Sequence, residues 1–270
     1  FIINLPFYGF AVICIDHPEL RKISKEITNK KIISYGIDSL DANVIAKNIN
    51  LKDYSSEFDV FFNLPGKIYP TVIKRVKLSV PGRHNILNCL AAIAVGIELE
   101  FDQELIKDAF SKFVSVKRRF TKVGSFNGAE IIDDYAHHPT EIRSTLSIAK
   151  NIAVQRKGKV IAVFQPHKYS RLSNLFNDFV DSFELADVVF ITDVYSAGEK
   201  EKKGYSGKDL ADAVGLKNKS CNYVPFEKIT HSLFEYGIDG NIIIIMGAGN
   251  ITSKAKNLQT ELQNFKNNFN

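Results

Sequence analysis

The sequence predicts an α/β protein with two domains, the second of which is a doubly wound, Rossmann-like fold. A chain of 270 residues is long enough for two domains of ordinary size. In its second half, apolar β-branched segments typical of buried strands alternate with amphipathic helical segments. A polar, basic, glycine-containing stretch at 115–127 precedes this half, so we divide the chain into domains 1–117 and 118–270.

The composition is typical of a soluble globular protein, with 45% hydrophobic and 24% charged residues. No apolar run approaches the ~20 residues that a membrane span needs, so we expect no membrane span. The net charge of +5 is carried by lysines spread along the chain, which argues against nucleic-acid binding. Cys14, Cys89 and Cys221 occur without CxxC spacing and are expected to be free thiols in a reducing cytoplasm.

The first domain is expected to open with a βαβ unit and to continue with antiparallel strands. An apolar strand at 10–16, a helix at 18–27 with one apolar face and a strand at 31–36 form this unit. Between 42 and 80 the pattern changes to short alternating segments with a Pro-Gly turn at 65–66. Such segments are typical of antiparallel strands.

Two helices follow, one after a Pro-Gly turn at 81–82 and one at about 102–113. The first begins with the polar residues His84, Asn85 and Asn88. Asn85 and Asn88 can share one face of the helix start, because residues three apart are neighbours on a helix. The competing interpretation is that Asn85 only caps the helix.

The second domain is expected to alternate strands with helices, which implies a parallel sheet with helices on both faces. The expected strands cover residues 129–135, 159–165, 187–194, a segment near 223, and 241–246. The expected helices cover residues 139–155, 171–185, 206–214, a segment from about 228, and the carboxyl-terminal segment. Gly247, Gly249 and Asn250 are interpreted as a tight βα turn and not as a dinucleotide-binding loop.

The most informative segment is 133–141, which reads Asp-Asp-Tyr-Ala-His-His-Pro-Thr-Glu and follows the first strand of the second domain. Ligands bind at the carboxyl ends of strands in open α/β sheets, so this group of titratable side chains predicts a functional site. Pro139 suits the first turn of the following helix. His138 is interpreted as a buried, hydrogen-bonded structural residue.

A second cluster, Gln-Pro-His-Lys-Tyr-Ser-Arg at 165–171, follows the next strand. Its loop is again expected at the carboxyl edge of the sheet. His167, Lys168 and Arg171 supply one imidazole and two cationic side chains. These groups are suited to an anion such as a carboxylate or a phosphate.

Eight short motifs follow one another along the chain. They are LPFYG at 5–9, ISYG at 33–36, PGRHNILN at 81–88, VKRRF at 116–120, DDYAHHPTE at 133–141, FQPHKYSR at 164–171, DVYSAGE at 193–199 and MGAGNI at 246–251. In this order they resemble the Mur ligase family over essentially the whole chain. The resemblance implies the second half of a central ATPase domain, followed by a complete Rossmann-like carboxyl-terminal domain.

The sequence contains no G-x-x-x-x-G-K-[ST] phosphate-binding loop. Compared with the family it therefore resembles an amino-terminally truncated fragment, and the Mg²⁺ ligands are expected in the missing part. The resemblance implies an ATP-dependent step of peptidoglycan precursor synthesis in the cytoplasm. ATP would phosphorylate the lactyl carboxylate of UDP-N-acetylmuramate, and the amine of L-alanine would attack the acyl phosphate. Such chemistry depends mainly on positioning and on stabilisation of charge.

The resemblance also implies roles for individual residues. The nucleotide is expected to contact His84, Asn85, Asn88, Arg119 and Asp134. The reacting carboxylate and the incoming amino acid are expected to contact Tyr135 and His137. The alanine carboxylate and the acyl phosphate are expected to contact His167, Lys168 and Arg171.

Four of these residues, His137, His167, Lys168 and Arg171, are expected to be catalytic, and none is expected to bind a metal. His137 or His167 would orient or deprotonate the amine, because a neutral imidazole suits proton transfer near pH 7. The commonest family pattern has an arginine at the position of Lys168. Lysine keeps the charge but lacks the bidentate fork, so the carboxylate geometry is expected to be looser there.

Two alternative functions remain open. A murein-peptide ligase of cell-wall recycling shares the first cluster, although the second cluster favours the alanine-adding pattern. A non-catalytic nucleotide-binding module would also fit a chain that lacks the phosphate-binding loop. For residues 1–270 alone we expect no measurable ligation, because losing even one donor to the transition-state charge typically costs ~2.7–4 kcal/mol.

Overall fold

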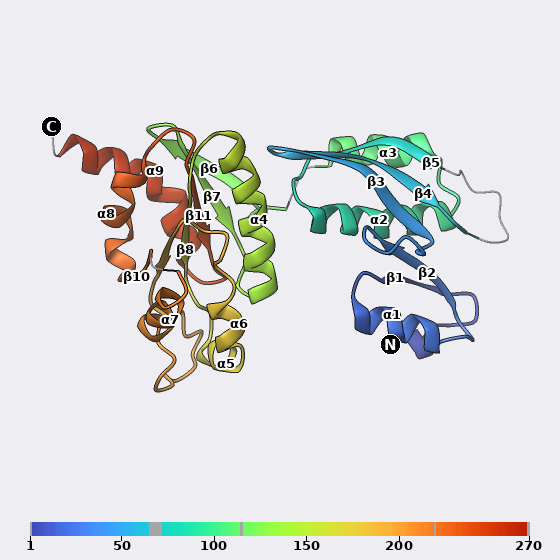
Figure 1. Ribbon diagram of the computed structural model, residues 1–270, viewed down its shortest axis with the longest axis horizontal. Coiled ribbons are helices and arrows are strands. Elements are labelled where there is room, and N and C mark those ends of the chain that lie inside the picture. Colours follow the sequence, from blue (N-terminus) through green and yellow to red (C-terminus); the bar gives the residue numbers. More distant parts are fainter. Residues whose placement is uncertain (1, 65–71, 114–115, 219, 269–270) are drawn as a thin grey trace. The chain divides into compact units, whose positions relative to one another are not determined.

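The protein, shown in Figure 1 as a computed structural model, forms two units, Phe1–Ser115 and Val116–Asn270. The structure describes residues 2–64, 72–113, 116–218 and 220–268. The division between the units falls two residues before the predicted boundary between 117 and 118. The turn predicted at 65–66 lies outside the described residues.

The first unit is built on a sheet with the strand order β1-β2-β3-β4-β5. Its strands are β1 (Phe10–Cys14), β2 (Lys31–Gly36), β3 (Val44–Lys52), β4 (Ser55–Phe62) and β5 (Val72–Leu78). β1, β2 and β3 run parallel, whereas β3, β4 and β5 are antiparallel. The predicted change from a βαβ unit to antiparallel strands is confirmed, although the strand predicted at 10–16 ends at Cys14.

Among its described residues, the first unit also contains three α-helices and a short 3-10 helix. They are η1 (Ile2–Asn4), α1 (Pro18–Glu26), α2 (Arg83–Glu98) and α3 (Gln103–Lys112). α2 and α3 pack on the sheet through a buried core that includes Phe58, Ile86 and Ile106. α3 is capped by Asp102, whose carboxylate accepts hydrogen bonds from the backbone N–H groups of Glu104 and Leu105.

The second unit is built on a sheet with the strand order β10-β9-β8-β11-β7-β6. Its strands are β6 (Thr121–Phe126), β7 (Ala129–Asp134), β8 (Val160–Phe164), β9 (Val188–Ile191), β10 (Cys221–Tyr223) and β11 (Ile242–Met246). All neighbouring strands are parallel except β6, which pairs antiparallel with β7. The predicted Rossmann-like sheet is therefore present, with one antiparallel edge strand.

From the sequence, no strand is expected within residues 115–127, but β6 lies within them. Of the strand's residues only Phe126 is buried, so the apolar alternation that marks a strand is almost absent from it. The strand is stabilised by its backbone pairing with β7. An edge strand of this kind leaves little signal in side-chain hydrophobicity.

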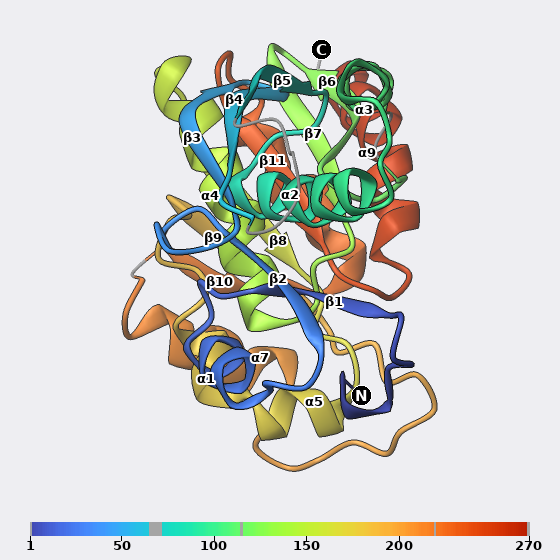
Figure 2. The same ribbon diagram turned by 90° about the vertical axis from the view of Figure 1, so that its right-hand side faces the viewer.

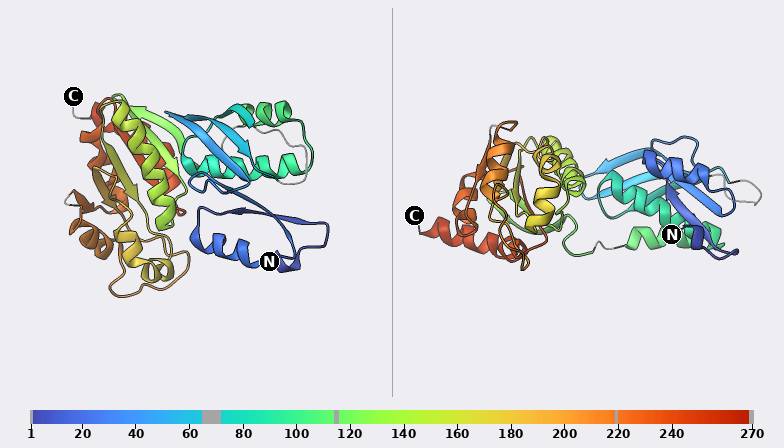
Figure 3. Two further views of the ribbon diagram at one scale, coloured as in Figure 1. Left: turned by 45° about the vertical axis from the view of Figure 1, so that its right-hand side comes forward. Right: turned by 90° about the horizontal axis from the view of Figure 1, so that it is seen from below.

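The helices of the second unit lie on both faces of the sheet (Figure 2, Figure 3). They are α4 (Pro139–Gln155), α5 (Tyr169–Asn174), α6 (Phe176–Val180), α7 (Gly207–Gly215), α8 (Ile229–Leu233) and α9 (Ile251–Asn267), with the 3-10 turns η2 (Phe226–Lys228) and η3 (Phe234–Tyr236). Ile243 and Ile245 of β11 belong to the core shared with α8 and α9. Figure 3 shows α4 on the opposite face.

The helix predicted at 171–185 is wrong in extent and in continuity. The chain instead forms α5 and α6, which are separated at Leu175, where φ is −121° and ψ is 23°. The apolar residues Leu172 and Phe179 are both buried, so the helical periodicity that predicted one helix is real. Periodicity reports which side chains are buried and is insensitive to a single non-helical residue between two short helices.

Candidate active site

The candidate active site of the second unit lies where four parallel strands end. Because β7, β8, β9 and β11 are parallel, the loops that follow them gather at one edge of the sheet. These loops carry the first cluster after β7, the second cluster after β8, the motif 193–199 after β9 and the glycine turn after β11. Both predicted clusters therefore share one edge, as their positions after strands indicate.

Four aromatic rings form a row at this edge. The ring centroids of Tyr135 and His137 are 5.0 Å apart, and those of His137 and His167 are 6.2 Å apart. His167 in turn stacks on Tyr195, with centroids 5.5 Å apart and an interplanar angle of 17°. The structure thus brings together the two imidazoles that the sequence assigns to different loops.

Tyr195, in the motif DVYSAGE, also lies at this edge, although no role is assigned to it from the sequence. The backbone N–H of Tyr195 donates to the carbonyl of Pro166 at 2.8 Å, and the N–H of Lys168 donates to the carbonyl of Tyr195 at 2.9 Å. Gly249 lies so close that an added Cβ would stand 2.6 Å from Cγ of Tyr195. This approach explains why the tight turn predicted after β11 has a glycine there.

His137 is held by two groups of its own segment. Its Nδ1 lies 2.9 Å from the carbonyl oxygen of Tyr135, and its backbone N–H donates to Oε2 of Glu141 at 3.0 Å. The same carboxylate oxygen lies 3.3 Å from Nδ1. Oε1 of Glu141 lies 3.6 Å from Nη1 of Arg119. One carboxylate therefore contacts both His137, which is expected to bind the incoming amino acid, and Arg119, which is expected to bind the nucleotide.

His138 is the N-cap of α4. Its Nδ1 accepts a hydrogen bond from the N–H of Thr140 at 3.4 Å, and the carboxylate of Glu141 accepts one from the N–H of His138 at 3.2 Å. Pro139 begins the helix, as predicted. The structural role expected for His138 is present, but the expected burial is wrong because a cap at a helix start remains exposed to solvent.

His167, Lys168 and Arg171 lie together at the start of α5. Nη1 of Arg171 is 3.3 Å from Nδ1 of His167. Burial lowers the pKa of His167, and the charges of Arg171, His137 and Lys168 lower it further. The imidazole is therefore neutral at pH 7, beside two cationic side chains that suit an anionic ligand.

A carboxylate from the loop after β9 holds this cluster in place. The carboxylate of Glu199 accepts hydrogen bonds from the backbone N–H of Ser170 at 2.8 Å and from its hydroxyl at 2.7 Å. Lys168 itself has a φ of 70°, in the left-handed region of the backbone that residues other than glycine rarely adopt. The loop after β9 therefore fixes the backbone on both sides of Tyr169.

Arg118 is a second residue that sequence reasoning missed, since the motif VKRRF directed attention to Arg119. Its guanidinium carbon lies 4.5 Å from the ring centroid of Tyr135, and Nη2 donates to the carbonyl of Gly247 at 2.6 Å. Nε lies 3.8 Å from Oδ2 of the buried Asp133, whose other oxygen, Oδ1, has no hydrogen-bond partner among the described residues. Arg118 thus joins the loops after β7 and β11.

Asp134 ends β7 and is only 4% exposed. Its carboxylate oxygens accept hydrogen bonds from the backbone N–H groups of Phe120 at 2.7 Å and Ala136 at 2.8 Å. Burial raises the pKa of Asp134, although these two hydrogen bonds oppose the shift. The carboxylate therefore fastens β7 to the segment that carries Arg119.

Replacing Asp134 by asparagine is expected to destabilise the second unit by about 1–3 kcal/mol. The amide NH₂ cannot accept a hydrogen bond, so the backbone N–H of either Phe120 or Ala136 would lose its acceptor. Hydrogen exchange of the β7 and β11 amides would measure this loss. The folded-state pKa is raised, so wild-type stability falls as the pH rises from the ordinary aspartate value, and the variant lacks this dependence. Asp178→Asn, an exposed control, should change stability by less than ~0.5 kcal/mol.

The other predicted nucleotide residues, His84, Asn85 and Asn88, belong to α2 of the first unit. Asn88 is exposed, and His84 and Asn85 are half-buried. Nδ2 of Asn85 donates to the carbonyl of Pro81 at 2.7 Å, while Gly82, with a φ of 99°, is the N-cap. The alternative that Asn85 caps α2 is therefore wrong.

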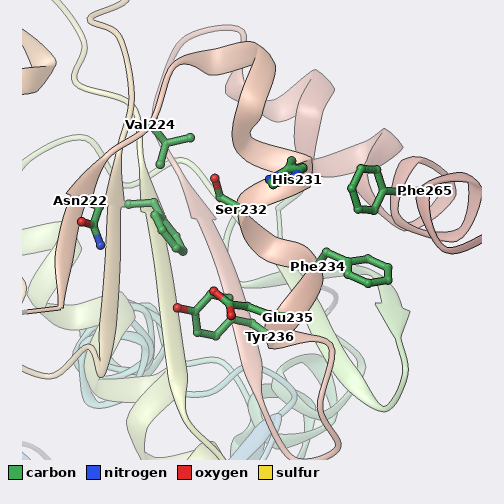
Figure 4. Close-up of a pocket in the computed structure, with 9 residues that line it drawn as sticks. Asn222, Val224, His231, Ser232, Phe234, Glu235, Tyr236 and Phe265 are labelled. Carbon is green, nitrogen blue, oxygen red and sulfur yellow. The ribbon is translucent and has the colours of Figure 1, made fainter. Parts of the chain in front are cut away.

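Other functional features lie away from this edge or are absent from the described part of the chain. A cavity of about 540 Å³ is lined by Phe190, Val224, His231 and Tyr236 among others, and includes no predicted site residue (Figure 4).

In the described ranges no three His, Cys, Asp or Glu side chains gather where a metal could bind. Every helix described falls short of the length and hydrophobicity needed to cross a bilayer. Cys14, Cys89 and Cys221 are free thiols.

Two family models match the chain. The Mur ligase middle domain matches residues 1–96, and the Mur ligase glutamate ligase domain matches residues 118–249. Among curated proteins, the UDP-N-acetylmuramate–L-alanine ligases of Rickettsia canadensis and Rickettsia africae are 53% and 52% identical to it. These matches cover 98% and 97% of this chain but 56% and 55% of the relatives. The chain thus spans little more than half of their length.

Solved structures lead to the same family. The UDP-N-acetylmuramate-alanine ligase of Thermotoga maritima matches with a TM-score of 0.68 and 27% identity, over 86% of this chain and 48% of that one. A murein peptide ligase of Psychrobacter arcticus matches with a TM-score of 0.65 over 97% of this chain and 53% of that one. Its identity of 23% supports the fold alone. With both domain models in order and relatives at this identity, the chain belongs to the Mur ligase family.

Proposed function

We infer that this chain supplies the amino-acid-binding part of an ATP-dependent ligase that joins L-alanine to the lactyl carboxylate of UDP-N-acetylmuramate. The observation that carries this function is the gathering of His137, His167 and Arg171 at one sheet edge, from the two loops with the most specific motifs. Relatives at 52–53% identity bear the name of that activity. The product would be a peptidoglycan precursor.

The chemistry assigns a different task to each group. Lys168 and Arg171 would neutralise the carboxylate of L-alanine and the charge of the acyl phosphate. His137 and His167 would act on the amine and on the oxygens that gain charge. His84, Asn85, Asn88 and Arg119 would contact ATP, while Asp134 would act near the nucleotide mainly by fastening the segment of Arg119 to β7.

The murein-peptide ligase is the second candidate. It is weaker because the solved example is 23% identical and supports the fold alone, whereas the alanine ligases of Rickettsia are 52–53% identical. A tripeptide in place of alanine would also have to be accommodated beside the same cationic pair. Offering alanine and tripeptide as competing substrates to one preparation would distinguish the two activities.

Ligation can be tested with a chimera. The segment of the Rickettsia canadensis ligase that this chain does not match would be joined to residues 1–270, and phosphate release would be followed with UDP-N-acetylmuramate, ATP, Mg²⁺ and L-alanine. We expect alanine-dependent release from the chimera and none from residues 1–270 alone. A folded chimera that binds nucleotide but ligates no amino acid or peptide would favour the non-catalytic module.

Lys168→Arg is expected to be tolerated in the chimera, with less than a tenfold change in kcat/KM for L-alanine. Arginine keeps the positive charge and adds a second donor for a carboxylate. The positive φ of residue 168 costs the same for either side chain, since both carry a Cβ. A loss greater than tenfold would mean that the compact ammonium of lysine is itself required.

A further inference from the structure

We propose that the two imidazoles are fixed in opposite tautomers, so that His137 is the base and His167 a hydrogen-bond donor, with Glu141 as the positioning residue for His137. The tautomers follow from contacts within the second unit. The catalytic roles rest on the proposed function. The sequence leaves deprotonation of the amine to either histidine, and the tautomers assign it to His137 and hydrogen-bond donation to His167.

The contacts of His137 require a proton on Nδ1. The carbonyl of Tyr135 lies 2.9 Å from Nδ1 and can only accept a hydrogen bond. Oε2 of Glu141, 3.3 Å from the same nitrogen, is also an acceptor when ionised. With Nδ1 protonated, the neutral ring keeps its basic lone pair on Nε2, which has no hydrogen-bond partner among the described residues.

The contact of His167 requires the reverse arrangement. Nη1 of Arg171, 3.3 Å from Nδ1 of His167, belongs to a guanidinium that can donate but not accept. Nδ1 must therefore hold the lone pair, and the proton of the neutral ring lies on Nε2. Burial and the neighbouring cations lower the pKa of His167, which keeps the ring in this neutral form. His167 can then offer one N–H to a carboxylate or an oxyanion.

Glu141 is suited to positioning because it stays ionised. Burial alone would raise the pKa of Glu141, but the hydrogen bonds from the backbone N–H groups of His137 and His138, together with the charge of Arg119, outweigh burial and lower it. The carboxylate also completes the capping box of α4 with His138. The capping box of α4 thus holds the carboxylate of Glu141 in place, and this carboxylate in turn orients the ring of His137.

The division of roles gives a balanced reaction. The ammonium nitrogen of the incoming amino acid loses its first proton to Nε2 of His137, and the freed lone pair forms the C–N bond to the acyl carbon. The N–H of His167 stabilises the oxygen that becomes negative. When the C–O bond to phosphate breaks, the departing phosphate oxygen takes the second proton of the nitrogen. His137 then returns its proton to solvent.

The tautomers can be read directly from the ¹⁵N chemical shifts of histidine-labelled protein, residues 1–270. We expect the neutral ring of His137 to show a protonated Nδ1 and a bare Nε2, and His167 to show the opposite. Finding Nε2 protonated in neutral His137, or Nδ1 protonated in neutral His167, would overturn the proposal. Because no turnover is needed, an inactive chimera with these tautomers refutes only the proposed function.

Variants test the positioning role. Glu141→Gln keeps the capping-box acceptor but removes the charge, so it should lower the share of Nδ1-protonated His137 and reduce kcat in the chimera by about tenfold or more, with KM for alanine little changed. Arg171→Met should release the tautomer of His167. Glu104→Gln, in the first turn of α3, is the matched control and should alter neither ring. An unchanged His137 spectrum and kcat in Glu141→Gln would remove Glu141 from the mechanism.

Discussion

His137→Asn is expected to reduce kcat of the chimera by about 10²–10⁴-fold, the usual contribution of general acid–base catalysis. This corresponds to about 3–5.5 kcal/mol of transition-state stabilisation. Asparagine can place Nδ2 near the position of Nδ1 and can donate to the carbonyl of Tyr135, so the local structure should survive. What it lacks is a basic atom at the position of Nε2. Initial rates at saturating ATP and alanine would measure the effect.

The control for this variant is the same substitution one residue later. His138→Asn keeps a preferred N-cap on α4 and leaves the ring of His137 in place, so kcat should stay within about twofold of the parent. If both variants lost activity equally, the effect would come from the start of α4 and not from a base. Full kcat in His137→Asn would exclude His137 from proton transfer and leave His167 as the only imidazole of the row.

Arg171→Ala is expected to reduce kcat/KM for L-alanine by about 10²–10³-fold, as removal of one charge-stabilising donor does in other active sites. Two losses add in this variant. The guanidinium no longer neutralises the carboxylate or phosphate, and Nδ1 of His167 loses the donor that fixes its tautomer. Part of the loss should therefore appear in kcat as well as in KM. Steady-state kinetics with varied alanine would separate them.

Arg171→Lys refines the same test. It restores the charge without the planar fork, so it should recover binding of alanine more than it recovers kcat. The matched control is Arg143→Ala, which removes an exposed guanidinium from α4 in the same unit. Its kinetics should equal those of the parent. Equal losses in the Arg143 and Arg171 variants would point to a general effect of positive charge.

The main features of the fold could be predicted because each rests on a strong local signal. β11 (Ile242–Met246) is fully buried on both faces, and its run of isoleucines is typical of a central parallel strand. β6 lacked such a signal, since it is held at the edge by backbone pairing and buries only Phe126. The break between α5 and α6 at Leu175 depends on two backbone angles, which no side-chain pattern encodes.

Some features of the candidate site could likewise be predicted from the sequence, whereas others depend on the folded structure. That His137, His167 and Arg171 lie at one sheet edge could be predicted, because the loops that carry them follow two apolar parallel strands. Glu141 was visible in the sequence only as a residue of a helix start, and its proximity to Nδ1 of His137 depends on how α4 is capped. Tyr195 comes from the loop after β9 and reaches His167 through a backbone bridge, which follows from the order of strands in the sheet.

The two oxygens of Glu141 face different partners, with Oε1 near Arg119 and Oε2 near His137. A ligand that draws Arg119 away from this carboxylate changes the charge beside His137 without touching the imidazole. Thermodynamic linkage is reciprocal, so a group bound at His137 must alter the affinity at Arg119 by the same factor. If the two substrates bind as proposed, Glu141 would couple their binding, and the sign of that coupling would set whether one substrate favours or opposes the binding of the other.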